Sequence, residues 1–287
     1  MKLSLCNEMF LNVGWSLEKQ IDFIAECGYN GVEIAPFAID PEIMANPDCP
    51  EMNLDRITAA QRRNMVKMAD AAGVELAGLH WLLSRTKNYH ITSFTQEVRD
   101  RTADYLIRLV ELSADFGGTY MVLGSPGQRN YPSGFTRNEA AGNAARVIEK
   151  VLPVLEKHNI ILALESLAPK ETNFWQTAAE TLGFIKMMGS PKNLMLHLDC
   201  KAMSGGEKEP IPEIIRKPEN SPYMKTFHAN DPNLQGPGFG DLDFAPIMAA
   251  LKDIGFDGWI GVEPFDYSPG VEALAKESIA CLKQYLD

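Results

Sequence analysis

The sequence has few cysteines, and they form no recognisable framework. Its 287 residues contain five, an odd number, and no two of them form a Cys-x-x-Cys pair. This scarcity argues against a disulfide-stabilised fold and against a thiolate zinc site. Isolated thiols are typical of a reducing compartment, so we expect a cytoplasmic protein.

Long apolar segments and an excess of basic charge are also missing. No stretch approaches the about 18 apolar residues of a membrane helix, and polar residues interrupt positions 1–8 too early for a signal peptide. Lys and Arg number 27 against 38 Asp and Glu, which gives a net charge of -11. Because such a charge repels polyanions, neither nucleic acid nor a membrane is expected as a partner.

The sequence does contain a regular alternation of short β-rich apolar runs and longer segments with helical periodicity, which is typical of parallel βα units. In one unit Ser16 is the predicted N-cap of a helix that runs to Cys27 and stops at Gly28. Eight units average about 36 residues, close to the repeat of a (β/α)8 barrel. We therefore predict an α/β fold, a single-domain (β/α)8 TIM barrel over residues 1–287. Its strands are predicted at residues 3–6, 31–35, 74–80, 119–124, 160–165, 194–199, 225–228 and 259–263.

Two connections are longer than a barrel of this size needs. Residues 36–57 contain four prolines and are predicted as an irregular loop, and residues 200–223, rich in Gly, Pro, Glu and Lys, form a second long connection. Both follow the carboxyl ends of predicted strands, where TIM barrels place their active sites. They are therefore candidate walls or lids of a pocket.

Four side chains that can bind metals end four successive predicted strands: Glu165, Asp199, His228 and Glu263. Their separations of 34, 29 and 35 residues are each about one βα unit, so a closed barrel brings them to the same rim. A single carboxylate there could simply cap the next helix, but four in register favour one divalent metal ion, which would also relieve the repulsion among three carboxylates. This ligand set suits Mn²⁺, which we favour, and also Mg²⁺, Co²⁺ or Zn²⁺.

The second half of the chain carries motifs that resemble a known family. They are GFGDLDF at residues 238–244 and GFDGWIGVE at 255–263, together with the four predicted ligands. With them the chain resembles the xylose isomerase-like TIM-barrel superfamily, and within it the sugar phosphate isomerase/epimerase group that includes ketose 3-epimerases of the D-tagatose 3-epimerase type. In those epimerases a second Glu near the substrate follows the first metal Glu by six residues. Glu165 and Glu171 match these positions.

The chain departs from the epimerase pattern at two positions. Where those enzymes place a substrate-contacting His and an Arg, this chain has Ala202 and Leu234. The resemblance therefore does not fix the substrate, nor whether it is phosphorylated. Endonuclease IV belongs to the same superfamily, but its trinuclear zinc site needs more histidines than the five available here. A dimer or tetramer is expected only by analogy with the family.

A metal flanked by two glutamates suits proton transfer beside a ketone. We predict that Glu165 and Glu263 are the acid/base pair as well as ligands, in an isomerase or epimerase that acts on a small sugar through a metal-stabilised enediolate. A dehydratase of the inosose dehydratase type has the same ligand requirements and remains an alternative, as does a non-catalytic sugar-binding barrel. Charge and the small number of histidines disfavour a DNA-repair nuclease.

Five further residues are candidates for contact with the sugar. His80 ends a predicted strand and is followed by Trp81, so the two suggest a hydroxyl-binding group beside an aromatic wall, although a buried structural His fits the sequence equally well. Trp15 is a second wall candidate, Lys201 could reach an anionic or carbonyl group, and Arg129 could reach a phosphate or carboxylate. Plain packing, a solvated lysine and a strand-ending turn are the respective alternatives.

Two other residues near strand ends are assigned no direct contact with metal or sugar, Glu33 by the family resemblance and His197 by its position. Glu33 is favoured as a structural residue of the barrel rim. His197 lies two positions before Asp199 and shares its side of the strand, so we expect it to contact a metal ligand rather than the metal.

Overall fold

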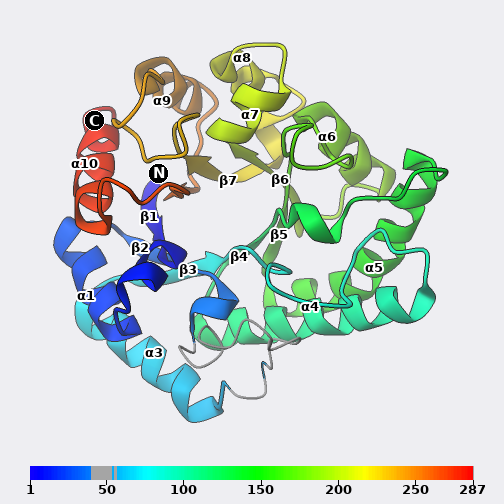
Figure 1. The fold of residues 1–287 in the computed structure, drawn as a ribbon, viewed down its shortest axis with the longest axis horizontal. Coiled ribbons are helices and arrows are strands. Elements are labelled where there is room, and N and C mark those ends of the chain that lie inside the picture. The colour runs from blue at the N-terminus through cyan, green and yellow to red at the C-terminus, as the bar shows by residue number, and fades with distance from the viewer. Residues whose placement is uncertain (40–53, 55–56, 287) are drawn as a thin grey trace.

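The computed structural model describes residues 1–39, 54 and 57–286, and it confirms the predicted (β/α)8 barrel. Eight parallel strands close in sequence order, with β8 pairing β1. Helices surround them, and the last helix, α10, packs beside the first, α1 (Figure 1). In the described part of the chain, no helix is both long and apolar enough to cross a membrane.

All eight predicted strands are present, and each observed boundary lies within one residue of the predicted one. The strands are β1 (Lys2–Cys6), β2 (Gly31–Ile34), β3 (Glu75–Leu79), β4 (Tyr120–Leu123), β5 (Ile161–Glu165), β6 (Leu194–Asp199), β7 (Met224–Ala229) and β8 (Trp259–Val262). The helices are α1 (Leu17–Cys27), α3 (Ala59–Ala72), α4 (Gln96–Phe116), α5 (Arg137–His158), α6 (Ala178–Met187), α7 (Cys200–Gly206), α8 (Ile211–Arg216), α9 (Phe244–Asp253) and α10 (Val271–Lys283). Short 3-10 turns are η1 (Asn7–Val13), η2 (Pro36–Ala38), η4 (Pro126–Gln128) and η5 (Ser221–Tyr223).

Helix α1 forms as its sequence predicts. The Ser16 hydroxyl accepts a hydrogen bond from the backbone N–H of Lys19, which satisfies one of the free donors of the first turn. Ile21 and Ile24 are fully buried against the barrel. Gly28 ends the helix with φ 85°, a conformation that a residue with a Cβ rarely adopts. The chain then turns directly into β2.

Aromatic side chains fill the amino-terminal part of the barrel interior. Tyr120 from β4 and Trp259 from β8 have ring centroids 6.4 Å apart and pack with small residues such as Ala163. Gly31 on β2 has to lack a side chain because an added Cβ would lie 2.8 Å from the Trp259 ring. This packed layer is a floor, so the space for a ligand lies at the carboxyl ends of the strands.

One of the two long connections contains helices that were not predicted from the sequence. Residues 200–223, predicted as a long connection, contain the helices α7 and α8, and α7 begins immediately after β6. Asp199 caps α7, and Ile211 and Ile214 of α8 are buried. Of the predicted loop 36–57, residues 40–53 and 55–56 lie outside the described residues.

Candidate metal centre and cavity

The four predicted metal ligands meet at the carboxyl end of the barrel. Glu165 and Asp199 are the last residues of β5 and β6, His228 lies on β7 opposite Asp199, and Glu263 directly follows β8. One ligand atom from each lies within 4.8 Å of the ligand atom of every other. All four side chains are buried. The barrel's register thus gathers residues that span 98 positions of sequence, from 165 to 263.

The two carboxylate oxygens of Asp199 have different partners: one caps α7 and the other contacts Asn230. Its Oδ1 accepts a hydrogen bond of 2.6 Å from the backbone N–H of Ala202 and so caps α7. Its Oδ2 accepts one of 2.5 Å from the Asn230 side chain, which also donates to the backbone oxygen of Glu263. Asn230 was not predicted from the sequence. Its place just after β7 was the only signal available.

His228 is held by carboxylates on both sides of its ring. Nδ1 lies 3.0 Å from Oε2 of Glu263, and Nε2 lies 2.9 Å from Oε2 of Glu33. Glu33 also accepts a hydrogen bond from the Ser4 hydroxyl, and a Cβ at Gly261 would overlap with its carboxylate. Burial raises the pKa of Glu33, but the charge and hydrogen bond of His228 outweigh it and lower this pKa to about 2.

Glu165 is the carboxylate that most needs a counter-charge. Burial, followed by the charges of Glu263 and Asp199, raises the pKa of Glu165 to about 8. A bound divalent cation would offset the burial and repulsion of the Glu165 charge. Three carboxylates and an imidazole are suitable ligands for such an ion. The Glu165 carboxylate lies against Gly124, where a Cβ would overlap with its Oε2. The residues present therefore fit a single metal ion.

Arg129 binds backbone oxygen atoms at this site, and its side chain does not line the cavity. Its guanidinium is fully buried and donates to the backbone oxygens of Glu165, at 2.6 Å, and Trp175, at 3.4 Å. It also donates to the Thr172 hydroxyl. The prediction that Arg129 contacts a phosphate or carboxylate of the substrate is therefore wrong, because these contacts turn it away from the cavity. It fixes the end of β5 instead.

A cavity of about 500 Å³ opens beside the cluster, and two of the four predicted ligands, Glu165 and Glu263, line it. Of the predicted sugar contacts, His80, Trp81, Glu171 and Lys201 line it. The Trp81 indole N–H donates to Oε1 of Glu263 at 2.6 Å, and the Lys201 ammonium lies 2.8 Å from Oε1 of Glu171. The remaining walls come mainly from the connections after β4, β5, β7 and β8. They include Ser84, Val122, Ser125, Pro126, Gly127, Gln128, Leu167, Leu234 and Phe265.

Three residues of the cavity wall hold unusual backbone conformations. Trp81, Ser125 and Leu234 have φ of 53°, 43° and 76°, in the left-handed region that non-glycine residues seldom occupy. Such a conformation costs about 1–3 kcal/mol for each residue, and it persists only where surrounding contacts impose it. Strained backbone is common at ligand sites, and here it directs three side chains to the same cavity.

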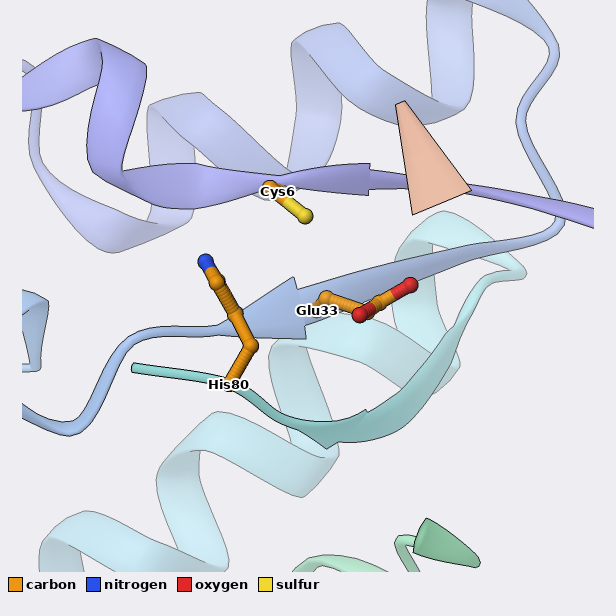
Figure 2. A group of neighbouring side chains, drawn as sticks. All are labelled: Cys6, Glu33 and His80. Carbon is orange, nitrogen blue, oxygen red and sulfur yellow. The ribbon is translucent and has the colours of Figure 1, made fainter. Parts of the chain in front are cut away.

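His80 belongs to a second buried cluster next to the predicted metal ligands. Its Nε2 lies 2.6 Å from Oε2 of Glu8, a residue that was not predicted from the sequence. Cys6 on β1, Glu33 on β2 and His80 just past β3 come from neighbouring strands (Figure 2). Burial is the main cause that raises the pKa of the Cys6 thiol well above its usual value.

Trp15 and His197 have different outcomes: Trp15 lies away from the cavity, whereas His197 packs on a predicted metal ligand, as expected. Trp15 does not line the cavity: it stacks on Phe10 with centroids 5.2 Å apart and lies beside Phe23 on the outer side of η1. Packing therefore explains Trp15, and its proposed role as a sugar wall is wrong. His197 has Nδ1 2.7 Å from the Thr226 hydroxyl, and its ring packs 4.2 Å from that of His228. Its ring therefore packs against His228 and limits the movement of that side chain.

Comparison with known proteins defines the family. Residues 21–285 match the family model described as "Xylose isomerase-like TIM barrel". This match covers most of the chain, and the protein therefore belongs to that family. The resemblance noted in the sequence is confirmed.

Individual relatives are sugar epimerases. The D-psicose 3-epimerase of Agrobacterium fabrum is 32% identical over 130 residues, which are 44% of this chain and 44% of that enzyme. The L-ribulose 3-epimerase of Mesorhizobium japonicum is 29% identical over 189 residues, 66% of this chain and 62% of that enzyme. The chain thus matches less than two thirds of either relative's length. The structure of the 3-keto-D-glucoside 4-epimerase from E. coli superimposes with a TM-score of 0.81 over 99% of both chains at 17% identity, which shows a shared fold.

Proposed function

We propose that this protein is a divalent-metal-dependent epimerase that inverts a carbon atom next to the carbonyl group of a keto sugar. The observation that carries the proposal is the convergence of Glu165, Asp199, His228 and Glu263 within 4.8 Å at the mouth of a barrel. The cavity beside them is large enough for a sugar. Relatives over parts of the chain are named as 3-epimerases, which supports epimerisation over dehydration.

The two glutamates are suited to move protons from different sides of a bound sugar. Glu165 extends from β5 and Glu263 from β8, with β6 and β7 between them. One carboxylate takes the proton from the carbon, and the other returns a proton to the opposite face, which inverts that centre. The cation supplies the electrophile that polarises the carbonyl and stabilises negative charge. We favour Mn²⁺ because the site offers three carboxylates and one imidazole.

The surrounding residues hold the glutamates in place. Trp81 donates a hydrogen bond to Glu263, and Arg129 anchors the backbone of Glu165. Lys201 and Glu171 form a pair on the same wall, with the ammonium positioned to donate to sugar hydroxyl groups. We propose that His80 also donates to or accepts from the sugar through Nδ1, which has no hydrogen-bond partner among the described residues.

Solvent exchange tests this function directly. Mn²⁺-loaded protein is incubated in deuterated water with D-psicose, L-ribulose, D-fructose and keto-glucosides, and the products are analysed by NMR and mass spectrometry. We expect deuterium at the carbon beside the carbonyl and formation of the epimer without loss of water. Glu165→Gln and Glu263→Gln should each reduce the exchange rate by at least about a hundredfold. The matched control is Glu75→Gln, on an exposed carboxylate at the opposite end of the barrel.

Three outcomes would contradict the proposal. If exchange survives in both glutamine variants, the acid/base pair is misassigned. If the products have lost water, the protein is a dehydratase. If no keto sugar exchanges and the protein binds no Mn²⁺, it is not a metal-dependent epimerase.

A further inference from the structure

The cavity is larger than one six-carbon sugar requires. A hexose has the bulk of about six water molecules, roughly 180 Å³ at about 30 Å³ per water. The cavity volume is about 500 Å³. A single sugar ring seated against Glu165 and Glu263 would leave more than half of the space to water. The remaining space is therefore available to a second group attached to the reacting ring.

An apolar ridge, formed by Trp81, Leu234 and Phe265, lines the cavity. The Trp81 and Phe265 rings lie 6.2 Å apart at 35°, and Leu234 exposes 40% of its surface although it is strongly hydrophobic. The Leu234 backbone oxygen accepts hydrogen bonds from the N–H groups of Phe265 and Asp266, at 2.7 and 2.8 Å. These contacts hold Leu234 at φ 76° and fix its side chain at the cavity wall.

The ridge is continuous with the predicted reaction centre. Its inner member, Trp81, donates a hydrogen bond to Glu263. Phe265 lies two residues after Glu263 and has the Lys201 ammonium 4.1 Å from its ring centroid. A ligand that places its reacting carbon at the glutamates therefore extends naturally along aromatic faces, which suit the C–H faces of a sugar ring.

The charge of the wall disfavours a phosphate in this space. Among the lining residues that the structure describes, Lys201 is the only lysine or arginine, and its charge is already paired with Glu171. His80 is paired with Glu8. Phosphate sites in proteins usually present arginine or lysine groups that are free to make charge-assisted hydrogen bonds.

From size, apolar surface and charge together, we propose that the natural substrate is an uncharged keto-glycoside. Its keto-sugar ring lies at the four-ligand cluster, and its second, glycosidically linked ring packs on the Trp81, Leu234 and Phe265 ridge. This inference rests on the proposed epimerase function, and it names the class of sugar on which the same site acts.

Calorimetric titration of the Mn²⁺-loaded full chain separates the possible ligands. The probes are methyl 3-keto-glucoside and 3-ketosucrose, which share a keto ring and differ by the second ring, together with D-fructose and D-fructose 6-phosphate. We expect 3-ketosucrose to bind at least about tenfold more tightly than the methyl glycoside. Phosphorylation of fructose should bring no gain in affinity.

Variants test whether the ridge causes the preference for 3-ketosucrose. In a Leu234→Ala, Phe265→Ala double variant the preference for 3-ketosucrose over the methyl glycoside should fall to about threefold or less. Met187→Ala, an exposed apolar residue at the end of α6, is the control and should keep the full preference. Thermal unfolding of each variant verifies that it is folded.

The results distinguish this inference from the function on which it rests. Equal affinity for the two keto-glucosides, tighter binding of the fructose phosphate, or an unchanged preference in the folded double variant overturns the inference, as does the absence of binding by any probe. Deuterium exchange on a free ketose without a preference for glycosides leaves the epimerase function standing. Tight binding of 3-ketosucrose without exchange supports the ridge and contradicts epimerisation.

Discussion

Nε2 of His228 lies 2.9 Å from Oε2 of Glu33, which joins β7 to β2 across the barrel interior over 195 residues of sequence. A carboxylate that accepts from Nε2 fixes the orientation of the ring and leaves Nδ1 directed at Glu263 and the other ligands. The glutamate predicted as a structural residue of the rim therefore has a specific task. It orients the His228 ring so that Nδ1 faces Glu263 and the predicted metal site.

Glu33→Gln should weaken metal binding without removing a ligand. The amide keeps the size of the side chain but loses the charge that favours an Nε2–H donor, and such a change typically lowers metal affinity about 10- to 100-fold. Calorimetric titration with Mn²⁺ measures the effect. Glu75→Gln removes an exposed carboxylate at the other end of the barrel and should bind Mn²⁺ like the wild type. Equal affinities in the two variants would show that Glu33 does not orient His228.

The Arg129 side chain should contribute strongly to stability. Arg129→Met removes the donors for the backbone oxygens of Glu165 and Trp175 and for the Thr172 hydroxyl, all in a buried setting. The Trp175 oxygen keeps a hydrogen bond from the Leu167 N–H, and the Thr172 hydroxyl keeps its bonds to Asn130 and Phe174. The main loss is the 2.6 Å bond to the Glu165 oxygen, and since an unpaired buried acceptor costs about 1–3 kcal/mol, the free energy of unfolding should fall by about that amount. Urea denaturation measures this loss.

Arg137→Met is the matched control for Arg129→Met. Arg137 forms a half-exposed ion pair with Glu180 on the outer helices, and its removal should lower the free energy of unfolding by less than about 1 kcal/mol. Similar losses in the two variants would mean that the buried contacts of Arg129 add little.

The convergence of the four predicted metal ligands could be anticipated because it depends only on the repeat of the βα units. Each lies at or beside the carboxyl end of a strand, and closure of the barrel brings these ends together at one rim. Glu8 and Asn230 escaped prediction because their roles depend on side-chain direction, in turns just past β1 and β7. Sequence spacing carries no information about that direction.

The incorrect predictions also arise because sequence spacing does not give the direction of a side chain. Arg129 follows β4 at the carboxyl end of the barrel, as predicted. Its guanidinium points into the protein because it donates there to three buried acceptors. Trp15 follows β1, yet the η1 turn between them carries it to the outside, onto Phe10. The helix α7 was missed because two of its seven residues are glycines, although Asp199 provides a strong N-cap.

The pairing of Glu8 with His80 should make stability depend on pH. Burial lowers the pKa of His80, but the charge and hydrogen bond of Glu8 outweigh it and raise this pKa above its usual value. A group whose pKa is raised by folding contributes stability that is complete below its unfolded pKa of about 6.5 and is lost as the pH rises through the folded pKa.

Glu8→Gln removes this charge and should lower the pKa of His80, which NMR titration of the imidazole detects. The difference in the free energy of unfolding between wild type and variant should therefore be larger at about pH 6 than at about pH 9. Urea denaturation at the two pH values provides the comparison. A difference that grows toward high pH would contradict the assigned sign.

Two glycines in one turn allow the position of Glu165 to be tested with the same substitution. Gly124 directly follows β4 and lies against Glu165, and an added Cβ there would overlap with the Glu165 carboxylate. Gly127, three residues later, has no atom within 4 Å of the position of an added Cβ. Neither glycine has a positive φ, so alanine introduces no backbone strain at either site.

Gly124→Ala should therefore displace the Glu165 carboxylate and impair both metal binding and proton transfer, whereas Gly127→Ala should leave Mn²⁺ affinity intact. We expect at least about a tenfold loss of Mn²⁺ affinity and of deuterium exchange in the first variant, because a carboxylate moved by about 1 Å is no longer placed for ligation or for proton abstraction. Wild-type affinity and exchange in folded Gly124→Ala protein would show that the Glu165 carboxylate acts from another position. Since both variants add one methyl group to the same turn, a loss confined to Gly124→Ala cannot arise from the turn itself.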